Sequence, residues 1–335
     1  GEHLLGGAPQ GTLESRLPAD RAGDLAGFVT AARSTQRLPG LIAAFADATG
    51  SLEWLRTIGV AGLAPLRAPT PDVTLRIGSI SKTMTAMLVM QLVERGVVQL
   101  EGDVNNYLTS YRVRGPEGEQ LTVRSLLNHT SGLAMRPGIE VGCAPGTVPT
   151  LADFYGPELV GQRPPGNDFA YSNDAFATLG QLVADCTGTS LAEHANAEFF
   201  IPLGMHETSY LVSGVPTRPT FDGIDLDAGE LAPVPNMEVI IAGAGSVYST
   251  LHDMALFGAA MHGKGANQHG RVLSEESFAA LVLPDESVQG LPPGIHPCLA
   301  WMRADVPGAK MWWHNGGWPG AKSEIGILPE LGRTV

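Results

Sequence analysis

The segment Gly78-Ser79-Ile80-Ser81-Lys82 contains a Ser-x-x-Lys at the start of an apolar run that extends from Ile80 to Val93. The run predicts a buried helix, so Ser79 and Lys82 would lie three residues apart on one helical face. A serine hydroxyl is a weak nucleophile until a base removes its proton, and a partly desolvated amine can be that base. The helix N-terminus adds a positive field and free N–H groups that can support an oxyanion. The segment therefore predicts a nucleophile, its base and the start of an anion hole.

Chance and structure offer a second interpretation of the same four residues. Ser-x-x-Lys arises by coincidence in many chains, and a perturbed lysine can have a structural role. Lysine is scarce here, however, because only four of the 21 basic residues are lysines. A lysine inside an apolar helix is costly unless it has a partner or a task. Other motifs must decide between the two interpretations.

Composition limits the classes of protein to which the chain can belong. Its 335 residues, 44% hydrophobic and 16% charged, predict a globular protein with a large core. The formal net charge of −13 and the lack of a basic block argue against a nucleic-acid partner. No apolar stretch approaches the roughly 18–20 residues that span a bilayer, and no signal-peptide pattern is visible. We expect a soluble protein whose compartment the sequence does not identify.

The cysteines and the short motifs predict neither a metal nor an organic cofactor. Cys143, Cys186 and Cys298 are spaced irregularly and match neither a zinc pattern nor a disulfide framework. Gly-x-Gly-x-x-Gly, P-loop, His-Glu-x-x-His and Gly-x-Ser-x-Gly motifs are all missing from the sequence. Because Gly-x-Ser-x-Gly is missing, the sequence does not predict the nucleophile elbow that α/β-hydrolases usually have.

The hydrophobic pattern predicts strands near both ends of the chain and helical pieces between them. The expected strands are residues 41–48, 51–61, 73–77, 299–303, 310–314 and 324–328. A mild helical pattern covers 21–37, and the pieces 122–128, 175–186 and 191–200 alternate with Gly/Pro loops. Because the strands return through hairpins and not through βαβ units, their sheet would be antiparallel. The predicted fold is α+β, an antiparallel sheet flanked by helices.

The same pattern predicts three parts of the chain. Residues 1–37 form an N-terminal segment and helix, residues 38–100 and 236–335 share the α/β sheet subdomain, and residues 101–235 form a mostly helical insert. The sheet would thus be built from both chain ends.

A second polar motif lies within the helical insert, in Asp168-Phe169-Ala170-Tyr171-Ser172-Asn173. Its Tyr-x-Asn would put two polar side chains on one side of an extended turn. A tyrosine can shuttle a proton where nearby cations lower its pKa, and an asparagine can position a substrate amide or carbonyl. The structural alternative is a tyrosine that fills the core with its hydroxyl satisfied.

The third motif is Trp312-Trp313-His314-Asn315-Gly316-Gly317-Trp318-Pro319-Gly320. Here an expected strand ends in a histidine and continues into glycines, where a ligand backbone could approach closely. A substrate along this strand could make main-chain hydrogen bonds, with an N–H near Gly317 completing an oxyanion site. Alternatively, His314 is a strand-end residue packed between tryptophans.

Taken together and in this order, Ser-x-x-Lys, Tyr-x-Asn and His-x-Gly resemble the serine β-lactamase and penicillin-binding-protein superfamily. The similarity covers roughly residues 38–335 and favours its class C-like branch of class C β-lactamases, D-Ala-D-Ala carboxypeptidases, D-aminopeptidases, family VIII esterases and related acyltransferases. The surrounding segments 75–83, 121–133 and 243–250 agree with it. The resemblance implies a β-lactamase/transpeptidase-like fold. His129-Thr130-Ser131-Gly132 also resembles the family, and we interpret it as a structural turn beneath the site.

The resemblance also implies a role for each motif residue. Ser79 would be the acylated nucleophile, Lys82 its proton acceptor or hydrogen-bond partner, and Tyr171 the proton relay. Asn173, His314 and Gly316 would bind the substrate. The backbone N–H groups of Ser79 and Gly317 would form the oxyanion hole. Which group is the base at each step belongs to the coupled Ser–Lys–Tyr cluster.

Two departures from the family pattern affect these expectations. His314 stands where many relatives carry the lysine of Lys-Thr-Gly, and a histidine is a weaker, pH-dependent cation. This lowers the expectation of β-lactam hydrolysis and raises that of ester, amide or acyl-transfer chemistry. The sequence given also ends at Leu331-Gly332-Arg333-Thr334-Val335, within an expected strand. We expect a second chain or a missing segment to supply a last strand and a C-terminal helix, without which one sheet face would be bare.

The leading hypothesis is a serine hydrolase or acyltransferase that acts through a Ser79 acyl-enzyme on a small-molecule or short peptide substrate. One alternative is a β-lactamase or D-alanyl-D-alanine carboxypeptidase. A second is a non-catalytic sensor or scaffold that keeps the fold and becomes acylated without turnover. Substrate choice would lie in the loops 134–166 and 207–236, which the sequence does not decode.

Overall fold

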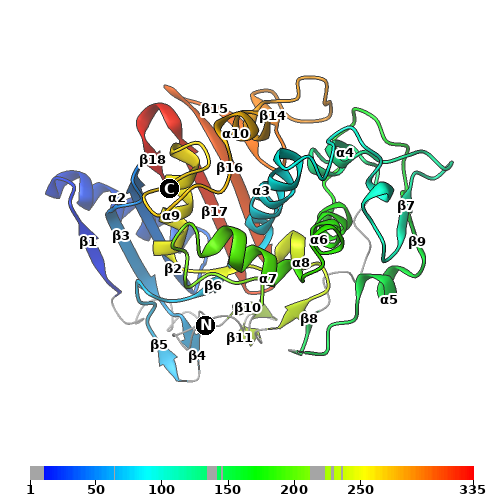
Figure 1. Cartoon of the computed structure of the whole chain (residues 1–335). Coiled ribbons are helices and arrows are strands. Elements are labelled where there is room, and N and C mark those ends of the chain that lie inside the picture. The colour runs from blue at the N-terminus through cyan, green and yellow to red at the C-terminus, as the bar shows by residue number, and fades with distance from the viewer. Residues whose placement is uncertain are drawn as a thin grey trace.

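The computed structural model describes residues 11–63, 65–133, 142–144, 146–211, 223–227, 230–234 and 237–335. An eight-stranded sheet runs through these residues in the order β1-β3-β2-β18-β17-β16-β15-β14 (Figure 1). The strands are β1 (Leu13–Ser15), β2 (Gly40–Asp47), β3 (Leu52–Gly59), β14 (Ile295–Pro297), β15 (Met302–Val306), β16 (Ala309–Trp318), β17 (Ala321–Leu328) and β18 (Arg333–Thr334). Every neighbouring pair is antiparallel. The predicted antiparallel sheet built from both chain ends is confirmed.

Tight turns set the register of this sheet. Between β2 and β3, the Asp47 carboxylate accepts hydrogen bonds from the backbone N–H groups of Thr49 and Ser51, which closes the predicted turn. β16 and β17 are joined by Pro319-Gly320, and Gly320 has the positive φ of 75° that glycine adopts without strain. The two chain ends meet where β18 pairs with both β2 and β17.

Helices cover both faces of the sheet (Figure 1). On one face lie α3 (Ser81–Glu94), α9 (Leu251–His262) and α10 (Glu275–Val282). There Phe278 of α10 packs edge-on against Trp312 at a ring-centroid distance of 5.7 Å. On the other face, α2 (Ala19–Thr35) buries Ala22 and Val29 against Trp54.

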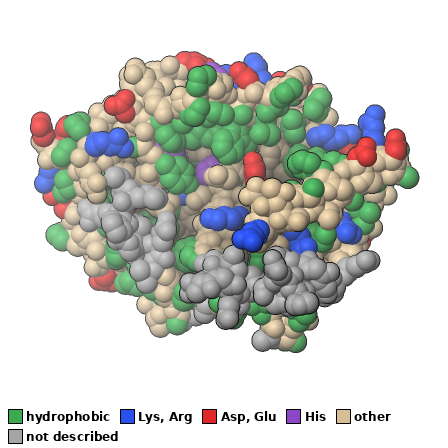
Figure 2. Space-filling view, turned by 180° about the vertical axis from the view of Figure 1, so that it is seen from behind, with side chains coloured by type: hydrophobic (Ala, Val, Ile, Leu, Met, Phe, Trp, Pro, Cys, Tyr) green, Lys and Arg blue, Asp and Glu red, His purple; other side chains and the backbone are tan. Residues whose placement is uncertain are grey.

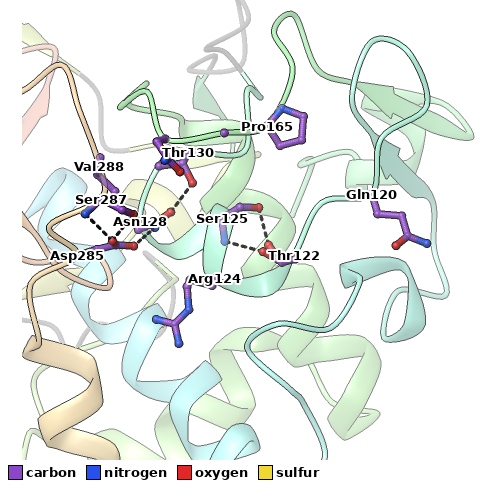
Figure 3. A pocket seen from close by; sticks show the side chains of 12 residues that line it. Gln120, Thr122, Arg124, Ser125, Asn128, Thr130, Pro165, Asp285, Ser287 and Val288 are labelled. Atoms are coloured by element: carbon purple, nitrogen blue, oxygen red, sulfur yellow. Dashed lines mark hydrogen bonds between the residues drawn. The ribbon is translucent and has the colours of Figure 1, made fainter.

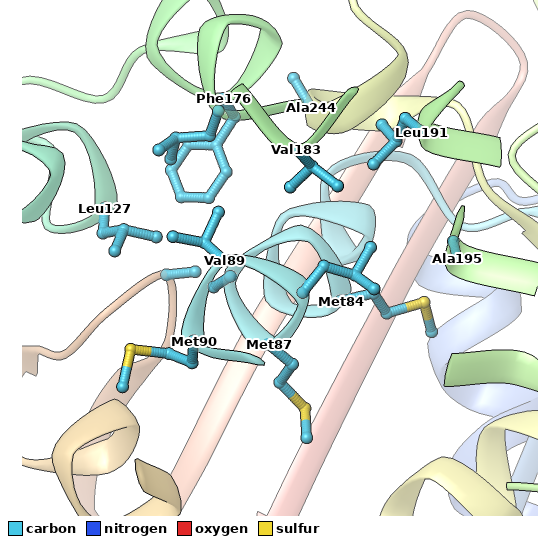
Figure 4. Close-up of a cluster of buried hydrophobic side chains, with 14 of the residues drawn as sticks. Met84, Met87, Val89, Met90, Leu127, Phe176, Val183, Leu191, Ala195 and Ala244 are labelled. Carbon is cyan, nitrogen blue, oxygen red and sulfur yellow. The ribbon is translucent and has the colours of Figure 1, made fainter. Parts of the chain in front are cut away.

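The apolar run after Ser79 forms the buried helix that the sequence predicts. Every residue from Ser81 to Leu92 in α3 is buried. Figure 4 shows how Met84, Met87 and Met90 project into the surrounding hydrophobic cluster. Neighbours of the three methionines in this cluster include Leu127 of α4 (Val123–Leu127), Phe176 and Val183 of α6 (Asn173–Thr187), Leu191 and Ala195 of α7 (Leu191–Ala195) and Ala244 of α8 (Ala242–Gly245). The tight packing fixes the start of α3.

Part of the sequence-based assignment is wrong. Residues 73–77 do not join the main sheet, because only β6 (Leu75–Arg76) pairs, and its partner is β13 (Tyr248–Ser249). The strand expected at 299–303 begins only at Met302, since Ala300 has a φ of 67°, outside the β region.

Residues 101–235 hold helices and also short strands. Besides α4, α6 and α7 there is α5 (Leu151–Tyr155), and 196–200 form a π-helical turn. β7 (Arg112–Arg114) pairs in parallel with β9 (Glu158–Val160), and β10 (Gly223–Asp227) pairs with β11 (Glu230–Val234). β8 (Gly142–Cys143) pairs with β12 (Glu238–Val239). The division into a sheet subdomain and a helical insert stays a prediction.

One sheet face carries partly exposed hydrophobic side chains. Because Trp312 faces α10 and side chains alternate along a strand, Met311 and Trp313 point to the opposite face, where both are half-buried. Figure 2 shows hydrophobic side chains gathered over the upper part of the face opposite to that of Figure 1. A further segment or second chain over this face stays a prediction. In the described part of the chain, no helix is both long and apolar enough to cross a bilayer.

Candidate active site

Ser79 lies in η1 (Gly78–Ile80), a 3₁₀ turn that leads directly into α3. The other serine of the motif, Ser81, is fully buried and donates a hydrogen bond to the carbonyl of Gly78 at 2.6 Å. Ser81 also accepts the backbone N–H of Val247 at 3.0 Å, so its hydroxyl is used to hold the turn. Ser79 is only half-buried. The turn therefore presents Ser79, and not Ser81, to a ligand.

Lys82 is fully buried and brings three segments of the chain together. Its Nζ donates to Ser79 Oγ at 3.0 Å, to Asn173 Oδ1 at 2.7 Å and to the backbone carbonyl of Ala244 at 2.7 Å. Asn173 is the first residue of α6, which Ser172 caps, and Ala244 belongs to α8. The predicted proximity of Ser79, Lys82 and Asn173 is thus present. Ala244 was missed, because a backbone carbonyl has no signature in the sequence.

Tyr171 stands immediately before α6 and beside the same amine. Its ring centroid lies 4.7 Å from Lys82 Nζ. One neighbour is His129, whose ring stacks on that of Tyr171 at 4.5 Å with an interplanar angle of 28°. The other is His314, at a centroid distance of 6.3 Å. Tyr171 therefore occupies the space between the lysine and two imidazoles.

His314 is buried in β16, and its Nδ1 lies 2.6 Å from the carbonyl oxygen of Asn315. Burial, and then the charge of Lys82, lower the pKa of His314 from 6.5 to about 3. The imidazole is therefore neutral at neutral pH. The sequence-based expectation of a pH-dependent cation at this position needs correction, because the enclosure of the ring disfavours its protonated form.

The end of β16 runs past the Ser79 turn, and no strand of the described residues pairs with its outer edge there. Trp318 and Ala321 flank the two-residue turn and form a hydrogen-bonded pair. The backbone N–H and C=O groups of Trp318, and of every second residue before it, therefore point to β17. Those of Gly317 point to the other side, where β15 reaches only as far as the pair Met302–Trp313. Gly317 therefore offers its N–H to the open edge beside Ser79.

Two glycines allow this close approach. Gly78 has a φ of 52°, and a Cβ on it would lie 2.7 Å from the backbone nitrogen of Gly317. A Cβ on Gly316 would lie 2.1 Å from the carbonyl oxygen of Ile77. Gly316 is thus a packing residue in this structure, and its contact with substrate stays a prediction.

A polar cavity of about 330 Å³ lies close to the Tyr171 loop (Figure 3). Asn128 and Thr130, the neighbours of His129, line it, and Asn128 Nδ2 donates to the Asp285 carboxylate at 3.0 Å. The other lining residues are Gln120, Thr122, Arg124, Ser125, Pro165, Gly166, Asn167, Ser287 and Val288. None of the candidate catalytic side chains lines this cavity. Across the described residues, no cluster of three or more His, Cys, Asp or Glu side chains is arranged to hold a metal ion.

An α+β fold with a Ser–Lys pair at the start of a buried helix defines a known class of serine hydrolases. The chain belongs to the Beta-lactamase family, whose model matches residues 25–335, and more closely to the class C-like branch of the β-lactamase and penicillin-binding-protein superfamily. The family comparison confirms the resemblance in the sequence.

Three relatives show how far the similarity extends. The chain is 27% identical to the unguisins hydrolase ungD' of Aspergillus campestris, over 97% of this chain and 62% of that protein. It is 32% identical to esterase EstB of Burkholderia gladioli, over 56% of this chain and 52% of that protein. The octameric penicillin-binding protein homologue from Pyrococcus abyssi superposes with a TM-score of 0.80 at 24% identity, over 93% of this chain and 72% of that one. The chain thus spans less than two thirds of both curated relatives, and the solved structure supports the fold.

Proposed function

We propose that this protein is a serine hydrolase or acyltransferase that forms an acyl-enzyme on Ser79 with an ester, amide or peptide-like substrate. The observation that carries the proposal is the 3.0 Å hydrogen bond between Lys82 Nζ and Ser79 Oγ, at a lysine with no exposed surface. A buried amine in contact with an accessible serine is one arrangement that can activate a serine for nucleophilic catalysis.

Two further acceptors, the oxygens of Asn173 and Ala244, would help to orient Lys82 for this task. A neutral amine has two N–H groups, which the oxygens of Asn173 and Ala244 would accept at 2.7 Å each. Its lone pair would then face the Ser79 hydroxyl and could accept the serine proton. Asn173 therefore has a positioning role in addition to any contact with substrate.

The reaction would proceed in two steps. In the first, Ser79 Oγ bonds to the substrate carbonyl carbon, and the oxyanion accepts hydrogen bonds from the N–H groups of Ser79 and Gly317. Tyr171 would relay the proton to the leaving group, whose bond to the carbonyl carbon then breaks. In the second step, the oxygen of water or an alcohol bonds to the acyl carbon, the bond from that carbon to Ser79 Oγ breaks, and the acid or ester leaves while Ser79 Oγ regains a proton. The location of the proton at each stage is a property of the coupled Ser–Lys–Tyr cluster.

His314 bears on the choice of substrate. A neutral imidazole supplies no positive charge for a substrate carboxylate, so we favour substrates with an uncharged group at this position. This argues for ester or amide chemistry over a dedicated β-lactamase or D-alanyl-D-alanine carboxypeptidase. The names of two relatives, an esterase and an unguisins hydrolase, agree with that preference.

A substrate panel tests the proposal. We expect turnover of a short p-nitrophenyl ester or a D-amino-acid amide to exceed that of a chromogenic cephalosporin, and Ser79→Ala to abolish it. Intact-mass measurement should detect an acyl adduct on the wild type and none on Ser79→Ala. Equal turnover by both proteins would reject the nucleophile, whereas a stable adduct without turnover would favour the sensor alternative. Added alcohol would separate acyl transfer from hydrolysis through the ratio of products.

A further inference from the structure

His129 holds the three consecutive residues around Tyr171 by three different contacts. Its backbone carbonyl accepts the N–H of Ala170 at 2.8 Å. Its Nδ1 accepts the N–H of Ser172 at 3.1 Å. Between these two hydrogen bonds, its ring stacks on Tyr171 at 4.5 Å. One residue therefore fixes the backbone before Tyr171, the ring itself and the backbone after it.

His129 is itself held rigidly. It is 1% exposed and has a φ of 64°, a left-handed conformation that glycine adopts without strain and in which asparagine, aspartate and histidine are enriched among the other residues. The backbone on either side is tied to α4, since the N–H of Asn128 donates to Arg124 and that of Thr130 donates to Ser125. The ring is also packed against Phe176 at 5.0 Å. A residue anchored in this way can position another.

The imidazole carries no charge in this position. Because Nδ1 accepts a hydrogen bond, the ring proton is on Nε2, which has no hydrogen-bond partner among the described residues. Burial, and then the charge of Lys82, lower the pKa of His129 well below 6.5. An unpaired buried N–H is unfavourable, and an apolar residue would avoid it. An apolar residue would, however, lose the acceptor for Ser172.

We propose that His129 is a positioning residue that directs the Tyr171 hydroxyl toward Ser79 and Lys82. The inference rests on the proposed function, since it assigns a task to Tyr171 in that reaction. It goes beyond the structural turn that the sequence indicates. A residue that only closed the turn would affect stability, whereas a positioning residue also affects the rate of the steps in which Tyr171 takes part.

The test uses His129→Asn, with Tyr171→Phe and the double variant. Asparagine tolerates a positive φ and its Oδ1 can accept the Ser172 N–H, so the substitution mainly removes the stacked ring. With a p-nitrophenyl ester we expect kcat to fall about 10- to 100-fold while KM changes less than about threefold. In the Tyr171→Phe background, the same substitution should change kcat less than about twofold, because the hydroxyl to be positioned is gone. Equal losses in both backgrounds, or an unchanged kcat in the single variant, would overturn the proposal.

Controls separate positioning from folding and from the proposed function. His194 of α7 is also a buried histidine whose Nε2 has no partner among the described residues, so His194→Asn should change the melting temperature and leave kcat unaltered. All rates are measured at a temperature where circular dichroism shows folded protein.

His129→Phe keeps a ring but loses the acceptor, and it should lower kcat less than His129→Asn. Unfolding of both His129 variants at every temperature would show a structural role and reject positioning. Ser79→Ala, measured in parallel, tests the proposed function separately. If the proposed function is wrong, Ser79→Ala keeps its turnover, whatever the His129 variants do.

Discussion

Lys82 and His314 are both basic side chains buried at the candidate site, yet their surroundings differ. At the start of α3, Lys82 Nζ faces three acceptor oxygens from Ser79, Asn173 and Ala244. In the middle of β16, the described contacts of His314 include one acceptor, the carbonyl of Asn315, and burial lowers its pKa to about 3. Burial alone therefore does not distinguish the surroundings of these two basic groups. They differ in the number and position of the acceptor oxygens that the fold places around them.

Lys82→Met would remove the amine at similar volume and should have the largest effect. Without the group that accepts the Ser79 proton, we expect kcat to fall about 10³- to 10⁴-fold. The carbonyl oxygens of Asn173 and Ala244 would lose a donor, so unfolding free energy should also fall, by about 1–3 kcal/mol. Ester hydrolysis under steady-state conditions and urea unfolding measure the two effects.

Lys310→Met is the matched control, because Lys310 lies on β16 with an exposed side chain. It should leave kcat within about twofold of the wild type. If Lys82→Met kept more than a tenth of wild-type kcat, Lys82 would not be the base. The different surroundings of Lys82 and His314 would then have no consequence for catalysis.

Gly78→Ala should have the next largest effect. A Cβ there would lie 2.7 Å from the nitrogen of Gly317 and would force β16 away from Ser79. Because one oxyanion donor is worth about 10²- to 10³-fold, we expect kcat to fall about 10²-fold. Gly96 has a φ of 72° and nothing within 4 Å of an added Cβ, so Gly96→Ala imposes similar backbone strain without the contact. Equal kcat values for Gly78→Ala and Gly96→Ala would contradict the role of the Gly317 N–H as an oxyanion donor.

The sequence predicts local parts of this site better than distant ones. Ser79 and Lys82 are three residues apart, so helix geometry alone brings them together. The carbonyl of Ala244 depends on tertiary packing and leaves no motif. The glycines of the third motif indicate an N–H near Gly317, but the strand register that turns this N–H to the open edge is visible only in the structure. Residues 73–77 have the composition of a strand, yet only Leu75–Arg76 pair. The loss of charge on His314 was also hidden, because the sequence names the residue but not its burial.

Stability should depend on pH because His314 is enclosed in its neutral form. The folded pKa is about 3 and that of the unfolded chain about 6.5, so below pH 6.5 the unfolded state binds a proton that the folded state does not. Stability therefore falls as pH falls, by about 2 kcal/mol for this residue between pH 6.5 and 5. The slope of unfolding free energy against pH is proportional to the number of protons taken up on unfolding. His314→Gln should reduce that number by about one below pH 6.5. Urea unfolding at several pH values measures the slope, and an identical slope in both proteins would contradict the enclosure of His314.

The smallest expected effect is that of His314 on the pH dependence of catalysis. Since its pKa lies near 3, the imidazole does not change charge between about pH 5.5 and 8.5, and glutamine replaces one neutral polar group with another. We expect His314→Gln to lower kcat/KM less than about tenfold, with a ratio to the wild type that stays constant across this range. Rate profiles for the two proteins on one neutral ester measure that ratio. An inflection near pH 6.5 that disappears in the variant would show that His314 titrates during the reaction, and it would contradict the enclosure of the ring in its neutral form.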